Sequence, residues 1–289
     1  MTDTDLMARL DAVLGRLERL LPATQPPSPI DWTQTPAARF VPGGAWRPLV
    51  RPARVRMDEL QWVDRQRDAL MANTAQFVAG VPANNVLLTG ARGTGKSSLV
   101  KACLAAFAAQ GLRLIEVDKA DLAHLPDIVD AVAALPQRFI VYCDDLSFDA
   151  GERGYQALKS VLDGSLAEAA DNVLIYATSN RRHLMPEQMQ DNLAARPGDD
   201  GEIHPGEAVE EKISLSERFG LWLAFYPFSQ AEYLDIVAGW LRHFGHTPEQ
   251  VAAAEREALQ FALQRGSRSG RVAWQYARDR AGRTALARP

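Results

Sequence analysis

Short apolar runs alternate with helical patterns through the middle of the chain. Each run carries hydrophobic residues at consecutive positions, which is typical of parallel strands covered by helices on both faces. We therefore predict an α/β fold, with strands at 86–89 and 112–117 and further strands starting at 138, 172 and 220. Apolar residues at helical spacing predict the intervening helices at 58–79, 97–109, 122–135 and 155–170.

The strand pattern ends near residue 227 and only helical patterns follow. Ser229 with Glu232 three residues later forms a capping-box pattern, and Thr247 before Pro248 marks a second helix start. These signals predict helices at 230–244, 248–265 and 270–280. We accordingly divide the chain into an N-terminal helix and arm at 1–50, an α/β domain at 51–227 and a small helical domain at 228–289.

The first region differs in composition from the rest. Leucines at helical spacing over 5–21 predict an amphipathic helix, which either packs on its own domain or binds a partner or a second copy. A Pro- and Gly-rich stretch follows, and we expect an extended arm whose Trp32, Phe40 and Trp46 dock on the main body. The polar segment 190–212 is expected to be a mobile loop.

The composition argues against several classes of protein. The 289 residues carry a net charge of −4, so overall charge does not support nucleic-acid binding. Cys103 and Cys143 lie inside apolar runs, which predicts buried thiols. No stretch reaches the ~20 apolar residues of a membrane span, and the acidic N-terminus is unlike a secretory signal. We therefore expect a cytoplasmic protein without a membrane span.

The stretch GARGTGKS at 90–97 fits the phosphate-binding pattern G-x-x-x-x-G-K-S/T between a predicted strand and a predicted helix. Its glycines let consecutive N–H groups converge on phosphate oxygens, with the positive end of the helix behind them. Lys96 would reach the β- and γ-phosphates, and the Ser97 hydroxyl would hold Mg²⁺. Nucleotide contacts are predicted for Gly90, Ala91, Arg92, Gly93, Thr94, Gly95, Lys96, Ser97 and Ser98.

An acidic pair follows the strand that starts at 138. The sequence FIVYCDD ends in Asp144 and Asp145. An acid in this place of a nucleotide-binding sheet completes the magnesium site, so we assign Mg²⁺ to Asp144 and Ser97. Asp145 would position or deprotonate the attacking water.

With these motifs the chain resembles AAA+ ATPases over roughly residues 50–280. The closer similarity is to the bacterial AAA+ family called domain of unknown function 815, carried by NTAQFVAGVPANNVLLTGARGTGKSSLVKA, FIVYCDDLSF, ATSNRRHL and EKISLSERFGLWLAF. The resemblance implies a P-loop NTPase fold with a five-stranded parallel sheet, helices on both faces and a small all-α lid domain. It also implies ATP and Mg²⁺ as cofactors. The family usually carries Asp-Glu where this chain has Asp144–Asp145, so the shorter acid implies slower turnover.

The resemblance also implies roles for residues outside the loop. Asn180, with Thr178 as the alternative, would contact the γ-phosphate and water from the strand between the loop strand and the acidic strand. Arg218 would reach the ATP of a neighbouring subunit as an arginine finger, which implies a homo-oligomer. The alternative for Arg218 is a surface ion pair with Glu217 or Glu211.

Two further assignments concern the nucleotide within the same chain. Arg271 would contact it from the lid domain, with Arg268 as the second choice and a solvated helix start as the alternative. In the family, residues before the loop pack on adenine. The candidates in this chain are Val55, Leu60 and Val63, and core packing explains each of them equally well.

Three functions are compatible with these residues. The first is an oligomeric, Mg-dependent ATPase that binds ATP and ADP and remodels or loads a macromolecular client of unknown identity. The second is a slow nucleotide-switched binding protein that recruits a partner through residues 1–50. The third is a small-molecule kinase, which the helical C-terminal domain with Arg271 disfavours. The segment after the second predicted strand, VDKADLAHLPDI, lacks the aromatic pore loop of polypeptide-threading relatives.

Overall fold

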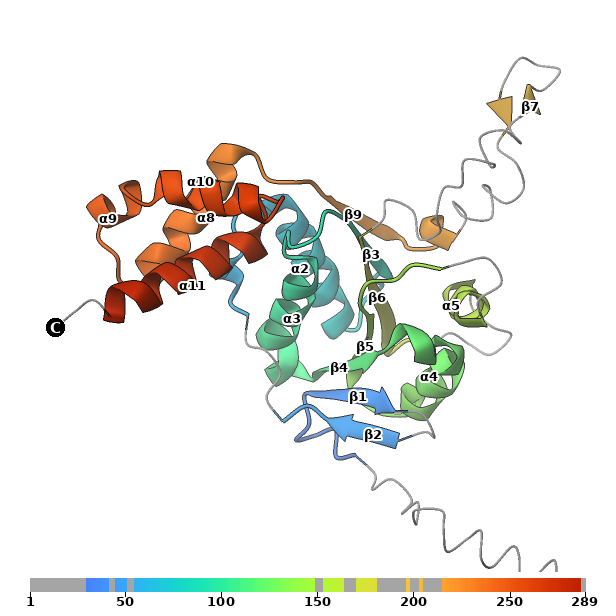
Figure 1. Ribbon diagram of the computed structural model, residues 1–289. Helices are drawn as coiled ribbons and strands as arrows, with labels where there is room; N and C mark the ends of the chain where they lie inside the picture. The colour runs from blue at the N-terminus through green and yellow to red at the C-terminus, as the bar shows by residue number, and fades with distance from the viewer. Residues whose placement is uncertain are drawn as a thin grey trace, which may run out of the picture.

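A mostly parallel sheet forms the centre of the computed structural model, which describes residues 30–41, 45–50, 55–148, 153–163, 170–180, 196–197, 203–204 and 215–286 (Figure 1). Its strand order is β2-β1-β4-β5-β6-β3-β9. The strands are β1 (Ala37–Val41), β2 (Ala45–Pro48), β3 (Val86–Gly90), β4 (Leu112–Val117), β5 (Arg138–Cys143), β6 (Val173–Ser179) and β9 (Leu221–Phe225). The five predicted parallel strands are confirmed, and β6 lies between β3 and β5 as the resemblance implied.

The prediction of five strands is corrected to seven, because the N-terminal arm adds a hairpin to the sheet. β1 pairs parallel with β4 and antiparallel with β2. The arm therefore pairs as strands of the sheet, whereas the prediction was an extended arm whose aromatic residues dock on the main body. Its prolines did not prevent pairing, because Pro48 ends the outer strand β2, where a missing N–H is tolerated.

The aromatic residues of the arm dock as predicted. The Trp32 ring packs edge-on against Trp46 at 5.7 Å and against Phe139 of β5 at 5.1 Å between ring centroids. Trp32 and Phe40 are both buried. Edge-to-face contacts of this kind add to the stabilisation from apolar burial, so these rings anchor the hairpin at the sheet edge.

Helices cover both faces of the sheet. The helices α2 (Asp64–Val78) and α3 (Lys96–Phe107) pack on one face, and α4 (Leu125–Ala133) and α5 (Arg153–Asp163) pack on the other. Alternate strand residues supply the two cores, so that Ile140 faces α3 and Val141 faces α4. Short 3₁₀ turns complete this part: η1 (Met57–Glu59), η2 (Ala108–Gln110) and η3 (Lys119–His124).

The C-terminal part is helical, as predicted, but it contains four described helices where three were expected. They are α8 (Gln230–His243), α9 (Pro248–Ala252), α10 (Glu255–Gln264) and α11 (Gly270–Leu286). The predicted second helix breaks at Ala253 and Ala254, where the Tyr276 hydroxyl binds the Ala254 carbonyl at 3.0 Å. The predicted capping box starts α8 at Ser229, and α9 starts after Thr247 as predicted, where Gln250 completes a capping box that was not predicted.

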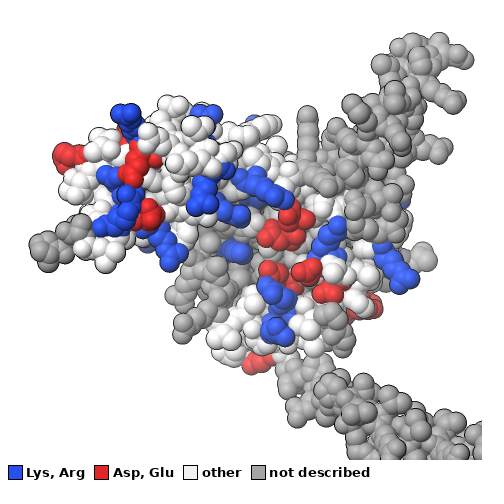
Figure 2. All heavy atoms as spheres, in the orientation of Figure 1, with Lys and Arg blue, Asp and Glu red and all other residues white. Residues whose placement is uncertain are grey.

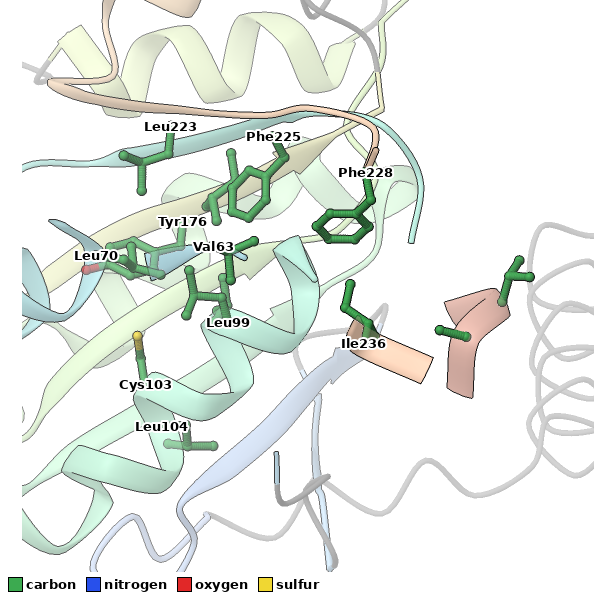
Figure 3. Packing of buried hydrophobic residues seen from close by; sticks show 14 of the residues in the cluster. Val63, Leu70, Leu99, Cys103, Leu104, Tyr176, Leu223, Phe225, Phe228 and Ile236 are labelled. Carbon is green, nitrogen blue, oxygen red and sulfur yellow. The ribbon is translucent and has the colours of Figure 1, made fainter. Parts of the chain in front are cut away.

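One hydrophobic core joins the helical part to the sheet. Figure 3 shows Leu70, Leu99 and Tyr176 packed beside the sheet, with Phe228 and Ile236 continuing the same cluster toward the helices. Phe228 comes directly before α8 and is 7% exposed. Because the two parts share buried side chains, the helical part lies against the start of α3, beside the predicted phosphate loop.

Some predictions fall on residues outside the described ranges. These are the helix at 5–21 and most of the loop 190–212, of which only β7 (Arg196–Pro197) and β8 (Ile203–His204) are described. The helix predicted at 155–170 is described up to Asp163. The division at residues 50 and 227 stays a prediction. Among the described helices, none has the length and apolar character needed to cross a membrane.

Candidate nucleotide-binding site

The loop between β3 and α3 has a backbone that only glycine can supply at two points. Gly90 has φ 122°, and an added Cβ there would lie 1.9 Å from the carbonyl oxygen of Phe225. Gly93 has φ 73°, and its added Cβ would lie 2.8 Å from the Ser269 hydroxyl. Left-handed φ values and these close approaches explain why glycine stands at both positions, of which the pattern G-x-x-x-x-G-K-S/T itself requires only Gly90. The loop is thereby pressed between β9 and the start of α11.

Lys96 lies beneath this loop at the first position of α3. Its Nζ donates to the carbonyl oxygens of Gly90 at 2.7 Å and Ala91 at 2.8 Å, and to Oδ1 of Asn180 at 3.1 Å. The residue is only 6% exposed. Burial lowers the pKa of Lys96 to about 8, against the opposing attraction of Asp145 and Asp144. The site therefore holds a buried cation that an anion would stabilise.

This lowered pKa predicts that nucleotide affinity falls as pH rises through about 8. Bound phosphate favours the charged amine, so above that pH binding must take up a proton, and ADP affinity should fall by up to about tenfold per pH unit. Calorimetric titration of ADP between about pH 7.5 and 9.5, in buffers of different ionisation heat, measures both affinity and proton uptake. A constant affinity without proton uptake over this range would contradict the prediction.

Asp144 is held by two hydroxyl groups. Its Oδ1 accepts hydrogen bonds from Ser97 Oγ at 2.8 Å and Thr178 Oγ1 at 2.6 Å. Burial raises the pKa of Asp144, but the neighbouring hydroxyls of Thr178, Tyr142 and Ser97 outweigh it and hold the pKa below the usual value. Asp144 is therefore a carboxylate at neutral pH.

These oxygen atoms fit Mg²⁺. The ion prefers oxygen ligands and is usually held by one or two protein groups together with substrate phosphates. Ser97 and Asp144 supply such a pair, 2.8 Å apart at the start of α3. No group of three or more His, Cys, Asp or Glu that could hold a metal occurs in the part of the chain that the structure describes. A protein-only metal site is thus not seen there.

Asp145 adopts an unusual backbone conformation next to this pair. Its φ is 54°, which is uncommon outside glycine although Asp tolerates it better than most residues. Its N–H donates to Thr178 Oγ1 at 2.9 Å, and its Oδ1 accepts from Asn180 Nδ2. Its Oδ2 lies 3.9 Å from a guanidinium nitrogen of Arg92. Both carboxylate oxygens of Asp145 are therefore engaged by cationic or amide groups.

Asn180 and Thr178 were alternatives in the sequence, and the structure places them in different positions. Asn180 lies between Lys96 and Asp145 and bonds to both. Thr178 links the Asp144 carboxylate to the backbone of Asp145. The Thr178 linkage was not predicted, although Thr178 lies only two residues before Asn180, near the end of β6.

The start of α11 closes the site from the other side. The backbone N–H of Arg271 donates to the Gly93 carbonyl at 3.3 Å. A cavity of about 660 Å³ lies between α11, the loop and the acidic pair, and Arg271 lines it whereas Arg268 lines a neighbouring hollow. On the face shown in Figure 2, acidic and basic side chains gather between the C-terminal helices and the rest of the chain.

Apolar side chains also line the cavity. Val55, Leu60 and Val63, the candidates for packing on adenine, all line it. The helical part contributes residues that sequence reasoning missed: Phe228, Ile236, Trp240 and Trp274. Their spacing within helices indicated only a helix face, so no signal in the sequence pointed to this cavity. Val63 is also part of the core, which agrees with the core-packing alternative for this residue, and its packing on adenine stays a prediction.

Arg218 lies away from the cavity and pairs with an acid that the sequence did not indicate. Its Nε donates to Oδ1 of Asp163, at the end of α5. Of the two expected partners, Glu217 belongs to the described residues and Glu211 lies outside them. Arg218 therefore does not contact its own site in this structure.

A family model matches most of the chain. Residues 33–284 match a family described as protein of unknown function (DUF815). The chain belongs to this family. The DUF815 match runs from the segment before β1 to α11, so it includes the hairpin, the sheet and the helical part. With β6 between β3 and β5 and a helical part after β9, the DUF815 chain has the arrangement that its resemblance to AAA+ proteins implied.

Three solved structures are distantly similar to this DUF815 chain. A chain of the E. coli MS115-1 HORMA:CdnC:Trip13 complex has 14% identity and a TM-score of 0.49, covering 78% of this chain and 90% of that one. The Thermotoga maritima RuvB Holliday junction branch migration motor has 13% identity and a TM-score of 0.39, and the similarity covers 77% of this chain and 70% of that one. A DNA replication initiation factor has 15% identity and a TM-score of 0.46, and the similarity covers 78% of this chain and 63% of that one. None of the curated proteins matches.

Proposed function

We propose that this DUF815 protein binds ATP with Mg²⁺ and hydrolyses it, as a homo-oligomer that remodels or loads a macromolecular partner. The observation that carries the proposal is the meeting of Lys96, Asp144, Asp145 and Asn180 in one cavity. They come from the carboxyl ends of neighbouring strands and the start of α3. Separate in sequence, these groups form one hydrogen-bonded set around the phosphate loop.

Each group suits a part of phosphoryl transfer to water. Lys96 and the loop N–H groups would hold the phosphates, and Mg²⁺ held through Ser97 and Asp144 would offset negative charge on the phosphate oxygens. Asn180 would orient the attacking water, and Asp145 would accept its proton. Arg271 would bind phosphate oxygen from the helical part, because its guanidinium is always charged and donates in a planar fork.

The position of Arg218 supports an oligomer. Arg218 does not line its own cavity, so it can act in the reaction only on the nucleotide of another copy. An arginine that approaches a transferring phosphoryl group neutralises the charge that develops there. Arg218 would then have to exchange Asp163 for phosphate when two copies meet.

A second function is favoured by the engagement of Asp145. Both of its carboxylate oxygens are occupied, by Asn180 and by Arg92, and its side chain is shorter than the glutamate usual in the family. A base held in this way would accept a proton slowly. The protein would then act as a nucleotide-dependent binding protein that stays in the ATP state for long periods and recruits its partner through residues 1–50.

Lys96→Ala tests the shared basis of both functions. The buried amine is the cation beneath the loop, so its removal should weaken ATP binding by about 100-fold and abolish hydrolysis. Binding is measured by titration calorimetry with Mg·ATP, and hydrolysis by phosphate release. Lys101→Ala, on the same helix, is the matched control and should retain both. Wild-type protein that binds no ATP, or Lys96→Ala that binds it normally, would refute the proposal.

A further inference from the structure

A buried tyrosine next to the candidate metal site carries a hydroxyl group without a hydrogen bond. Tyr142 lies on β5, two residues before Asp144, and packs in the same core as Leu99 of α3. The residue is 1% exposed. Within the part of the chain that the structure describes, no group forms a hydrogen bond of normal geometry with the Tyr142 hydroxyl. A buried hydroxyl in this condition destabilises the fold, because it has left water without gaining a partner.

The neighbouring strand carries a second buried tyrosine, whose hydroxyl is bonded. Tyr176 of β6 pairs in register with Tyr142 and belongs to the same core. Its hydroxyl accepts from Nδ2 of Asn73 at 3.1 Å and shares a hydrogen bond of 2.9 Å with Oγ1 of Thr74, both on α2. The hydroxyl at 176 therefore has a structural role. Core packing does not explain the hydroxyl at 142, since phenylalanine would fill nearly the same space.

The groups of the candidate metal site lie next to the Tyr142 hydroxyl. Ser97, Thr178 and Asp144 are all close enough to influence its pKa. Burial raises the pKa of Tyr142, and the negative charge of Asp144 raises it further, so the hydroxyl keeps its proton. A protonated tyrosine can donate one hydrogen bond and accept another. Both capacities are available beside the two residues assigned to Mg²⁺.

A bound Mg²⁺ ion offers partners for both. Mg²⁺ gives up its hydration reluctantly and keeps several water molecules in protein sites, and these waters are hydrogen-bond donors. The ion also fixes the carboxylate that holds it, which gives a neighbouring O–H a defined acceptor. Groups that bind the ligands of a metal orient those ligands, and removing one such group typically costs about 10- to 100-fold in metal affinity.

We propose that Tyr142 is a positioning residue of the magnesium site. Its hydroxyl donates to the Asp144 carboxylate and accepts from a water molecule of the Mg²⁺ hydration shell. Binding of the ion thereby satisfies a buried group that the chain by itself leaves unpaired, and this gain favours the magnesium-bound form. The inference rests on the proposed function and adds to it a residue that neither the phosphate-binding pattern nor the AAA+ resemblance assigns.

The test measures ADP binding to the full chain by titration calorimetry, once in EDTA and once with excess Mg²⁺. Wild-type protein should bind ADP more tightly with Mg²⁺ than in EDTA. Tyr142→Phe should bind ADP in EDTA within about twofold of the wild type, but it should bind Mg·ADP about tenfold more weakly. The loss is confined to the magnesium-dependent part, because the substitution removes only the hydroxyl that faces the ion.

Thermal melting without nucleotide gives a second readout, and Tyr176→Phe is the matched control. Tyr142→Phe should melt within about 1 °C of the wild type or higher, because the hydroxyl that it removes has no partner. Tyr176→Phe should melt about 2–4 °C lower, because it removes the hydroxyl that Asn73 and Thr74 bind. Its affinity for Mg·ADP should equal that of the wild type. A purely structural role of Tyr142 would give the same pattern in both variants.

The outcomes separate this inference from the proposed function. A wild type that binds no ADP, or whose ADP affinity does not depend on Mg²⁺, refutes the proposed function. Unchanged Mg·ADP affinity in Tyr142→Phe, or an equal loss of ADP affinity with and without Mg²⁺, overturns the role of Tyr142 and leaves nucleotide binding standing. A Tyr142→Phe protein that melts several degrees lower or does not fold overturns it as well, because the hydroxyl would then stabilise the fold itself.

Discussion

Arg218→Ala should reduce ATP turnover by about 10³-fold or more while ATP binding stays within about twofold of the wild type. Binding should persist because Arg218 does not line the cavity of its own chain. Turnover should fall because the neighbouring subunit loses the cation that offsets charge on the transferring phosphoryl group. Phosphate release at protein concentrations that permit assembly measures turnover, and calorimetry measures binding.

Asp163→Ala is the control for a purely structural role of Arg218. It removes the same ion pair, which is partly exposed and contributes about 1 kcal/mol or less to stability, but it keeps the arginine. If Arg218 acts as a finger, Asp163→Ala retains most of its turnover. Equal losses in the two variants would show that the ion pair, and not the finger, matters.

Mixing two inactive variants tests the action in trans. An Arg218→Ala subunit has all the residues of its own site but cannot supply an arginine to its neighbour. An Asp145→Asn subunit can supply the arginine, but its own site is defective. A mixed oligomer should regain measurable turnover, whereas each variant alone should not. The absence of any recovery, with mixed assembly verified by mass measurement, would contradict a finger shared between subunits.

Asp145→Asn should lower turnover by about 10²- to 10⁴-fold and leave ATP binding nearly unchanged. The amide has the shape of the carboxylate but cannot accept a proton from water. ATP should therefore remain bound for long periods, and the trapped oligomer can be weighed and any partner that purifies with it identified. Single-turnover phosphate release measures the loss of chemistry directly.

Two variants make this result interpretable. Asp130→Asn removes an exposed carboxylate on α4 and should have no effect, which controls for a change in net charge. Asp145→Glu restores the usual acid of the family, and it should raise turnover if the short side chain limits the reaction. Normal turnover in Asp145→Asn would refute its role as a base, whereas slow turnover of the wild type would favour the nucleotide-dependent binding protein.

Much of the fold could be predicted from the sequence because its signals are local. The apolar runs of β3, β5 and β6 are continuous, since these strands are buried on both faces. The starts of α8 and α9 follow from hydrogen bonds between residues three apart. The phosphate loop is equally local, because its glycines, Lys96 and Ser97 are consecutive and their spacing is set by the backbone turn.

The N-terminal hairpin could not be predicted, because β1 is stabilised by pairing with β4, which lies far along the chain. A short strand among prolines has little strand signal of its own, and it is stabilised by the backbone hydrogen bonds that the edge of β4 offers. The split of α9 from α10 is similar, since it depends on the contact of Tyr276 with Ala254. In both cases a distant contact outweighs local propensity.

The sequence by itself determined that the chain has a phosphate loop, an acidic pair at a strand end and a helical C-terminal part, because each depends on neighbouring residues. Only the tertiary structure decided which groups meet around that loop. It placed Thr178 between the two acids, paired Arg218 with Asp163, and brought the Tyr142 hydroxyl next to Ser97. These residues are far apart in the chain, and pairing of the strands and packing of the helices, not spacing, bring them together.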